Sequence, residues 1–388
     1  MAGQSLSRAF LRVGGATLAQ HQLGLALALD CQRIICLARG TSPEMIALQR
    51  MAEDAGLQFY IAPGARPLAG LVTASDELVV IGEGLFVDPA SVAPFFEGRS
   101  SAVLVQPVEG GLAAGFERID INRASAGVMR IPGHLVENLQ ELPDDCNVPS
   151  ALTRIALQAG VPMHEVPADL RSGVNWRLIR DESEAHVVEM EWLRDRFAEG
   201  EGTSPGRAIA RYGVLTFGSS LLHAGNASNM VSLGVIVALA IAGGFAWFGF
   251  AAVGFLVLVV AAVLVEASRF LRSAERHALG QLPPAIPRAN VLRWLVDAVF
   301  GLSLLAAISR LGGESLISWM FPPAVLMMLL AMIPRVVTGT AASLAADRAT
   351  LGLLLAFAAS FGQVEALVEV LAIALIVIGM SLPLRRKN

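Results

Sequence analysis

The sequence has few charged residues and few cysteines. Of its 388 residues, 16% are charged and 54% are hydrophobic, which fits a protein that lies partly in a membrane better than a soluble one. The net charge of −4 gives no basic footprint, so we expect no nucleic-acid partner. Cys31, Cys36 and Cys146 form no CxxC pair, which predicts reduced thiols in a cytosolic domain. The first residues lack a basic flank followed by an apolar core, so no signal peptide is expected.

The hydrophobic residues are concentrated in the second half of the chain. Met230–Ala267 is almost unbroken apolar sequence, and about 20 such residues span a bilayer as one helix, so this run suffices for two. The alternative, a buried helix pair in a soluble core, is rare for apolar runs of this length. We expect the two helices to turn between Gly243-Gly244 and Gly249. The predicted domains are an α/β domain over 1–198, a linker and interfacial amphipathic helix over 199–229, and a transmembrane domain over 230–388.

Short apolar segments alternate with helical ones in the first half. Strands are predicted at 33–38, 57–62, 78–81 and 102–107, with a helix at 45–55. This alternation is typical of an α/β domain with a mainly parallel sheet. Ligands of such sheets bind at the carboxyl ends of the strands. Gly82-Glu83-Gly84, which follows the third strand, is therefore expected in a cleft.

Three segments carry a resemblance to a known family. RAFLRVGG at Arg8–Gly15 resembles the K-A-L-L-P-V-G-G segment of MobA-like and sugar-phosphate nucleotidyltransferases. DELVVIGEGLFVD at Asp76–Asp88 resembles the strand of that family that ends in Gly-Asp and a metal-binding acid, and AGVMRIPGHL at Ala126–Leu135 resembles a later substrate-side strand and helix. The resemblance covers roughly residues 1–190 and implies a Rossmann-like nucleotidyltransferase fold.

This resemblance also implies a nucleotide site. It assigns nucleotide binding, with CTP as the expected ligand, to Arg8, Arg12, Gly14 and Gly15. It assigns a Mg²⁺ ligand to Glu83. Nucleotidyl transfer needs cationic groups on the triphosphate and acids that hold Mg²⁺ beside it.

The chain also departs from the family pattern in two places. The glycine-rich opening loop is reduced to residues 2–7, and the stretch at 176–185 lacks an acid at the second metal position. An active site and a retained fold with an altered site both stay open.

Six membrane spans are predicted in the second half. Their approximate limits are 230–246, 249–267, 291–309, 315–333, 340–360 and 364–383. A helix that begins at Ser204-Pro205 and ends near His223 precedes them and is loosely amphipathic, as a helix on the membrane surface would be. Loops rich in arginine alternate with nearly neutral ones. This pattern places the α/β domain and both termini in the cytoplasm of a bacterium, with the spans in its inner membrane.

Ionisable residues near the span ends are functional candidates by default. They are Glu266, Arg269, Arg293, Asp297 and the pair Asp347-Arg348. Two interpretations stay open: these groups converge on one polar cavity, or they form local ion pairs such as Arg293 with Asp297, four residues apart on one helix face.

The membrane half resembles the CDP-alcohol phosphatidyltransferase family in its six spans, its preceding surface helix and its acids at spans two and three. The full pattern of that family, D-x2-D-G-x2-A-R-x8-G-x3-D-x3-D, is not present. Glu266 and Asp297 are the plausible counterparts of its catalytic acids. The two halves together resemble bifunctional inositol-phosphate cytidylyltransferase/CDP-inositol transferases. That likeness implies CTP or a CDP-alcohol, a lipid acceptor and a homodimer.

Two functions remain open on the sequence. One is a membrane-bound transferase of polar-lipid headgroup synthesis, active in nucleotidyl transfer to a phosphorylated polyol, in phosphoalcohol transfer from a CDP-alcohol, or in both. The other is a catalytically degenerate paralogue that acts as a membrane scaffold or regulator. Transport is less consistent with the sequence, because the spans show no inverted repeat or paired broken helices.

Overall fold

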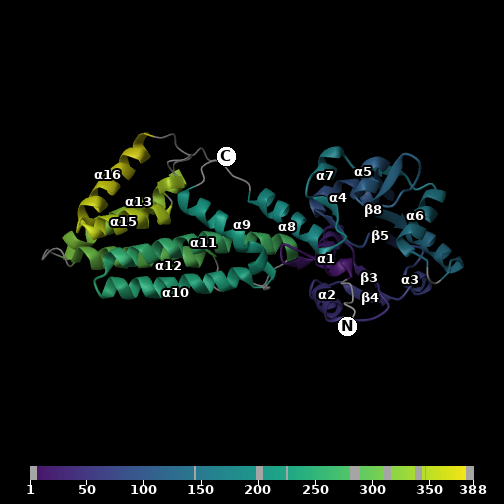
Figure 1. The fold of residues 1–388 in the computed structure, drawn as a ribbon, viewed down its shortest axis with the longest axis horizontal. Coiled ribbons are helices and arrows are strands. Elements are labelled where there is room, and N and C mark those ends of the chain that lie inside the picture. Colours follow the sequence, from purple (N-terminus) through teal and green to yellow (C-terminus); the bar gives the residue numbers. More distant parts are fainter. Residues whose placement is uncertain are drawn as a thin grey trace. The chain divides into compact units, whose positions relative to one another are not determined.

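The chain forms two compact units, shown as a ribbon in Figure 1. The structure is a computed structural model that describes residues 7–143, 146–197, 204–223, 226–279, 289–309, 316–336, 343–345 and 347–381. The first unit comprises Met1–Trp192 with His277–Gly280, and the second comprises Leu193–Arg276 with Gln281–Asn388. The first contains sheets and helices and the second is helical, so the expected order of an α/β region followed by an all-α region is confirmed.

The α/β unit opens with a short hairpin and a capped helix. The 3-10 turn η1 (Arg8–Phe10) leads into strands β1 (Arg12–Val13) and β2 (Ala16–Thr17) and helix α1 (Leu18–Ala28). Gly14 and Gly15 form the hairpin turn with φ of +62° and +84°, which the mirror-image turns of tight hairpins require. Thr17 begins α1 with a reciprocal capping box: its side chain accepts from the Gln20 amide, and the Gln20 side chain accepts from the Thr17 amide.

The predicted strands at 33–38, 57–62, 78–81 and 102–107 are confirmed as β3 (Arg33–Leu37), β4 (Gln58–Ala62), β5 (Glu77–Ile81) and β7 (Ala102–Pro107). The prediction of one mainly parallel sheet is wrong. β3 and β4 form a separate parallel pair, and a four-stranded sheet has the order β5-β8-β7-β9, where β8 is Arg123–Pro132 and β9 is Met163–Glu165. The ten-residue β8 runs antiparallel to both β5 and β7 and lies between them, which makes the sheet mixed.

Helices and a second small sheet complete the α/β unit. β6 (Leu85–Val87) pairs antiparallel with β10 (Trp176–Leu178). The remaining elements are α2 (Pro43–Asp54), α3 (Ala65–Leu71), α4 (Pro89–Val92), η2 (Ala93–Arg99), α5 (Val108–Ala113), η3 (Gly133–Glu141), α6 (Val148–Gln158), α7 (Ala168–Ser172) and α8 (Glu182–Arg196). Residues of α3, η3 and α6 form one core with β7 and β8, in which Ile131, Leu139 and Leu152 are almost completely buried.

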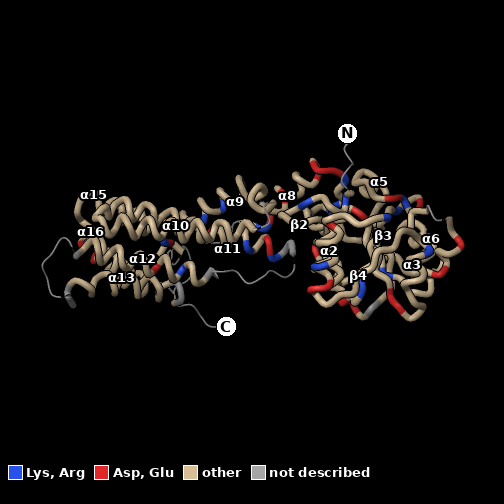
Figure 2. The backbone as a smooth tube through the Cα atoms, turned by 90° about the horizontal axis from the view of Figure 1, so that it is seen from below, with Lys and Arg blue, Asp and Glu red and all other residues tan. Residues whose placement is uncertain are grey.

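The second unit consists of long apolar helices. They are α9 (Pro205–His223), α10 (Ala227–Trp247), α11 (Ala251–Leu279), α12 (Ala289–Ser309), α13 (Leu316–Val336), α15 (Arg348–Ser360) and α16 (Val364–Ser381). Within the described ranges, three segments are long and apolar enough to cross a membrane: Ala227–Trp247, Ala251–Arg276 and Asn290–Ile308. Figure 2 shows charged residues spread over the α/β elements and sparse along α10, α12 and α13. The chain is therefore membrane-associated.

Two helix limits differ from those expected. α10 continues through Gly243 and Gly244 to Trp247, and the turn to α11 is formed around Gly249, whose φ is +88°. Gly249 alone of the three adopts a left-handed conformation, so the turn is made there. Within the span expected from residue 340, residues 343–345 are helical and α15 begins at Arg348. Asp347 caps α15 by accepting the Ala349 amide at 3.3 Å. Residues 340–342 lie outside the described ranges.

A close helix crossing organises the core of the helical unit. Phe255 of α11 and Phe300 of α12 are fully buried and stack with ring centroids 6.4 Å apart. Gly352 of α15 lies against them: a Cβ atom added there would be 2.7 Å from Val259 Cγ2 and 3.2 Å from Phe300 Cζ. Gly301 of α12 has space, since its nearest neighbour would be Met327 Cγ at 3.9 Å.

We predict opposite effects of Gly352→Ala and Gly301→Ala on stability. Alanine favours a helix over glycine by about 1 kcal/mol, so Gly301→Ala should raise the unfolding temperature of the full chain in detergent. Gly352→Ala should lower it, because overpacking a core costs about 1–3 kcal/mol. Thermal unfolding followed by circular dichroism measures both variants. Equal shifts in the two would contradict the close crossing.

Candidate functional site

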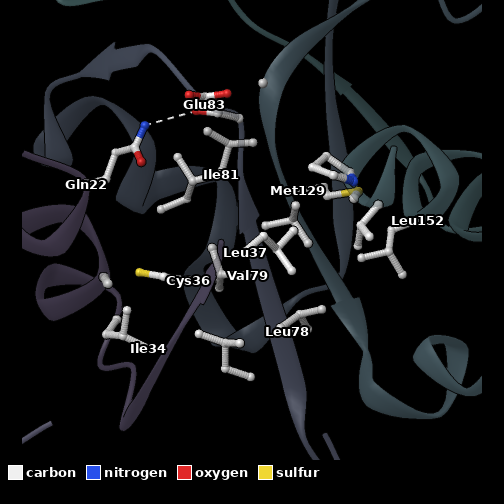
Figure 3. Close-up of a pocket in the computed structure, with 18 of the residues that line it drawn as sticks. Gln22, Ile34, Cys36, Leu37, Leu78, Val79, Ile81, Glu83, Met129 and Leu152 are labelled. Atoms are coloured by element: carbon white, nitrogen blue, oxygen red, sulfur yellow. Dashed lines mark hydrogen bonds between the residues drawn. The ribbon is translucent and has the colours of Figure 1, made fainter. Parts of the chain in front are cut away.

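The α/β unit contains a large cavity between β3 and β5. Its volume is about 1540 Å³, which exceeds the roughly 300–1,000 Å³ of ordinary ligand pockets. Figure 3 shows Gln22 and Glu83 at one end and Ile34 and Leu78 at the other, with Val79 between them. The cavity thus has an apolar interior and a polar rim at the carboxyl ends of the two strands.

The rim is held in place by contacts around Glu83, the residue expected to bind Mg²⁺. Ser7 Oγ donates a hydrogen bond to Glu83 Oε1 at 2.7 Å. Gln22 Nε2 donates to the Gly82 carbonyl at 2.9 Å and the Leu85 carbonyl at 3.0 Å. These two hydrogen bonds fix the backbone on both sides of Glu83. Gly84 has a φ of +81°. Glu83 is therefore an exposed carboxylate on a fixed loop.

Arg8 lies beside this loop. A Cβ atom added at Gly84 would be 3.4 Å from Arg8 Cβ and only 2.5 Å from the Ile179 carbonyl oxygen, so only glycine allows this approach. Arg8 and Glu83 both line the cavity. The structure thus brings together one residue expected to bind a nucleotide and the one expected to bind metal. A guanidinium can bind phosphate oxygens through paired hydrogen bonds.

The other three predicted nucleotide-binding residues do not line the cavity. Arg12, Gly14 and Gly15 form the β1–β2 hairpin instead. The Gly14 amide donates to Glu189 Oε1 at 2.9 Å, and a Cβ atom added at Gly14 would be 2.7 Å from the Trp192 ring. The turn amide that would bind a phosphate thus already has an anionic partner.

Sequence reasoning missed this role of Glu189. The side chain is fully buried on α8, where it contacts the hairpin rather than solvent. The available signal was an acid between Val188 and Met190 on the apolar side of the predicted helix. Buried carboxylates need hydrogen-bonded partners, so such an acid indicates a specific contact.

His21 on α1 is a titratable group close to the same hairpin. Its Nε2 lies 2.9 Å from the Val13 carbonyl oxygen, and its ring packs edge-on against Phe86 with centroids 4.9 Å apart. Burial lowers the pKa of His21 to about 4, although the bond to Val13 acts in the opposite direction. The neutral ring donates its Nε2 proton to Val13, so His21 is a structural link between α1 and β1.

In the helical unit, each of the two predicted catalytic acids has an arginine partner. Glu266 of α11 lies 3.1 Å from Arg269 and 3.1 Å from Arg293 of α12. Asp297 of α12 accepts from Arg348 Nε of α15 at 2.6 Å. The alternative of a local Arg293–Asp297 pair is therefore wrong, because both residues pair across helices. The ionisable groups do gather in one region, since Arg293 and Asp297 are one turn apart on α12.

Asp347 extends this charged cluster to α9. Its Oδ2 accepts from the Gly206 amide at 2.8 Å and from the Thr350 hydroxyl at 2.7 Å. The cavity beside Asp347 and Thr350 measures about 70 Å³, well below the roughly 300–1,000 Å³ of ligand pockets. In the described part of the chain, no three His, Cys, Asp or Glu side chains gather in a way that could hold a metal ion.

No protein-family model matches the chain, and no curated protein matches its sequence.

We predict that His21 makes stability depend on pH. Because its pKa is lowered from 6.5 to about 4 in the folded chain, the unfolded state binds the proton first as the pH falls. This contribution to stability is complete above pH 6.5 and is lost progressively towards pH 4. Denaturant unfolding of the full chain between these pH values should show the loss.

His21→Gln should flatten this pH dependence, while His164→Gln, at an exposed position, should keep it. An unchanged slope in His21→Gln would contradict the assignment.

Proposed function

We propose that the chain is a membrane-bound transferase of polar-lipid headgroup synthesis. Its α/β unit binds a nucleoside triphosphate, CTP by resemblance, and a phosphorylated polyol at the cavity rim, for nucleotidyl transfer. Its helical unit, with six spans in an inner membrane and the α/β unit on the cytoplasmic side, carries phosphoalcohol transfer from a CDP-alcohol to a lipid acceptor. The observation that carries this proposal is the juxtaposition of Arg8 and Glu83 at the rim.

The chemistry of the rim supports phosphate binding there. Arg8 supplies a permanent positive charge, and nucleotidyl transfer builds negative charge on the leaving pyrophosphate, which such a cation stabilises. Ser7 orients Glu83 through its hydroxyl. Ligands of α/β sheets bind beyond the carboxyl ends of the strands, where these side chains lie.

Mg²⁺ fits the two units differently. Protein sites often supply only one or two carboxylates to Mg²⁺, and substrate phosphates and water complete its octahedron. Glu83, exposed beside Arg8, fits as such a single ligand and would help to neutralise the triphosphate. Glu266 and Asp297 do not fit a metal pair, because each is already neutralised by arginine.

A second candidate function is a scaffold or regulator without turnover. The arginine partners of Glu266 and Asp297 favour it for the helical unit, since a catalytic acid has to be available to substrate or metal. The two functions differ in whether nucleotide binding is followed by lipid product.

We predict Mg²⁺-dependent CTP binding to the full chain in detergent, measured by calorimetry. Arg8→Ala should weaken it at least tenfold, since a hydrogen bond to a charged group contributes about 1.5–3 kcal/mol. Arg12→Ala, on the hairpin outside the cavity, is the matched control and should bind CTP like the unaltered chain. Absence of CTP binding to the unaltered chain would overturn the nucleotidyl-transfer proposal.

We predict that Glu266→Gln and Asp297→Asn each reduce headgroup transfer to lipid by about a hundredfold or more, as loss of a general base or electrostatic group does. The assay uses the full chain in vesicles with a radiolabelled CDP-alcohol. Glu275→Gln is the control: it weakens the bonds of Glu275 to Ser228 (3.1 and 2.5 Å) in the same unit without touching a candidate acid. Unchanged transfer in both test variants would favour the scaffold.

A further inference from the structure

β3 and β5 are edge strands of two different sheets, and both border the same cavity. β3 pairs only with β4, and β5 pairs only with β8, so each has one free edge within the described residues. Both strands line the cavity along their whole length. At their amino ends the long side chain of Arg33 spans the gap to Asp76 at 2.5 Å. The two strands therefore run in the same direction on opposite sides of a groove.

The ladder of β5 shows which backbone groups face this groove. The Gly82 amide donates to the Gly127 carbonyl at 2.8 Å, so even-numbered residues of β5 point their N–H and C=O groups at β8. Successive residues of a strand alternate in this respect. The N–H and C=O groups of Val79 and Ile81 consequently point into the groove.

The same reasoning applies to β3. The Ala38 amide donates to the Ala62 carbonyl at 3.1 Å, which directs even-numbered residues of β3 to β4. The backbone groups of Ile35 and Leu37 therefore face the groove. Unpaired backbone groups at two facing edges are costly unless water or another strand satisfies them.

The side chains of β3 and β5 also indicate that a neighbouring strand is missing between them. An uninterrupted apolar strand is typical of the middle of a sheet covered on both faces. Ile34–Leu37 and Leu78–Ile81 are such runs, yet none of these eight side chains is buried, and Leu37 is 44% exposed. The open groove between these two strand edges has a volume of about 1540 Å³, which leaves room for an occupant.

We propose that this groove is the binding place of one further β-strand, an apolar segment of polypeptide joined to the N-terminal side of Met1. Ser7 lies at the carboxyl end of β5, where it contacts Glu83. A strand whose chain continues through Met1 to Ser7 would thus have its carboxyl end towards the rim and run parallel to β3 and β5. Five residues match the length of both edges. The strand would join the two sheets into one, with the order β4-β3-strand-β5-β8-β7-β9.

This proposal is independent of the proposed function, but it bears on the same rim. The carboxyl end of the added strand would lie beside Arg8 and Glu83, and its last amides would be available to an anion there. The two strands that border the groove carry no charged side chain from Ile34 to Leu37 or from Leu78 to Ile81, which favours an apolar strand over a charged ligand along these edges.

The test adds the hexapeptide Val-Thr-Val-Ile-Val-Leu ahead of Met1 of the full chain, with a Gly-Ser hexapeptide as the matched control. Hydrogen exchange of the purified protein in detergent is measured by mass spectrometry. The apolar extension should slow exchange at least tenfold in the peptides that contain Ile35, Leu37, Val79 and Ile81. It should also raise the unfolding temperature of the α/β unit by about 5 °C. The Gly-Ser control should change neither quantity.

The free apolar hexapeptide tests the source of the strand. Attachment supplies a millimolar effective concentration, so the free peptide should protect the same segments only in the millimolar range. Equal protection by micromolar free peptide would overturn the attached source. Unchanged exchange in the extended chain, or protection confined to the outer edges of β4 and β9, would overturn the groove as its seat.

Discussion

A carboxylate among apolar helices has to be neutralised, and this constraint holds the helical unit together. Leaving a buried charge without its partner costs about 3–5 kcal/mol, and Asp347 is such a buried carboxylate. Glu266 meets Arg293, Asp297 meets Arg348, and Asp347 takes the Gly206 amide. These contacts join α9, α11, α12 and α15 in one region. The position of each helix along its neighbour thus depends on polar contacts that the apolar stacking of Phe255 on Phe300 does not specify.

The same constraint separates structural acids from acids that are available for chemistry. Glu189 in the α/β unit is fully buried and bonded to the Gly14 amide, and Glu266 and Asp297 are bound by arginine. Glu83 differs: it is exposed, and among the residues that the structure describes its hydrogen-bond partner is the Ser7 hydroxyl. An exposed acid beside Arg8 retains the capacity to meet a charged ligand. The rim therefore carries the stronger functional argument, and the helical acids carry the stronger argument for stability.

The sequence identified elements far better than it identified their partners. The apolar runs at β3, β4, β5 and β7 locate strands because burial depends on local composition. The composition of a strand does not show in which direction it runs relative to its neighbours. The antiparallel position of β8 between β5 and β7 could therefore not be predicted from the sequence. Spacing within a helix likewise offered Asp297 as the partner of Arg293, whereas the nearest opposite charges came from other helices. A local resemblance proposed Arg8 and Glu83, which line one cavity, but the contact of Glu189 with the hairpin required the three-dimensional structure.

The two ends of the α/β cavity suit different occupants. A triphosphate in the interior would lose hydration beside the apolar side chains of Ile35 and Val79. The neighbouring Arg130 already donates to the Phe96 carbonyl at 3.1 Å, so it replaces little of that hydration. At the rim the same ligand would meet Arg8 and remain in contact with water. The interior instead offers two rows of backbone donors and acceptors, which an extended peptide satisfies and a nucleotide does not. An apolar strand and a phosphate ligand therefore need not compete, because the strand would form the floor on which the rim binds its ligand.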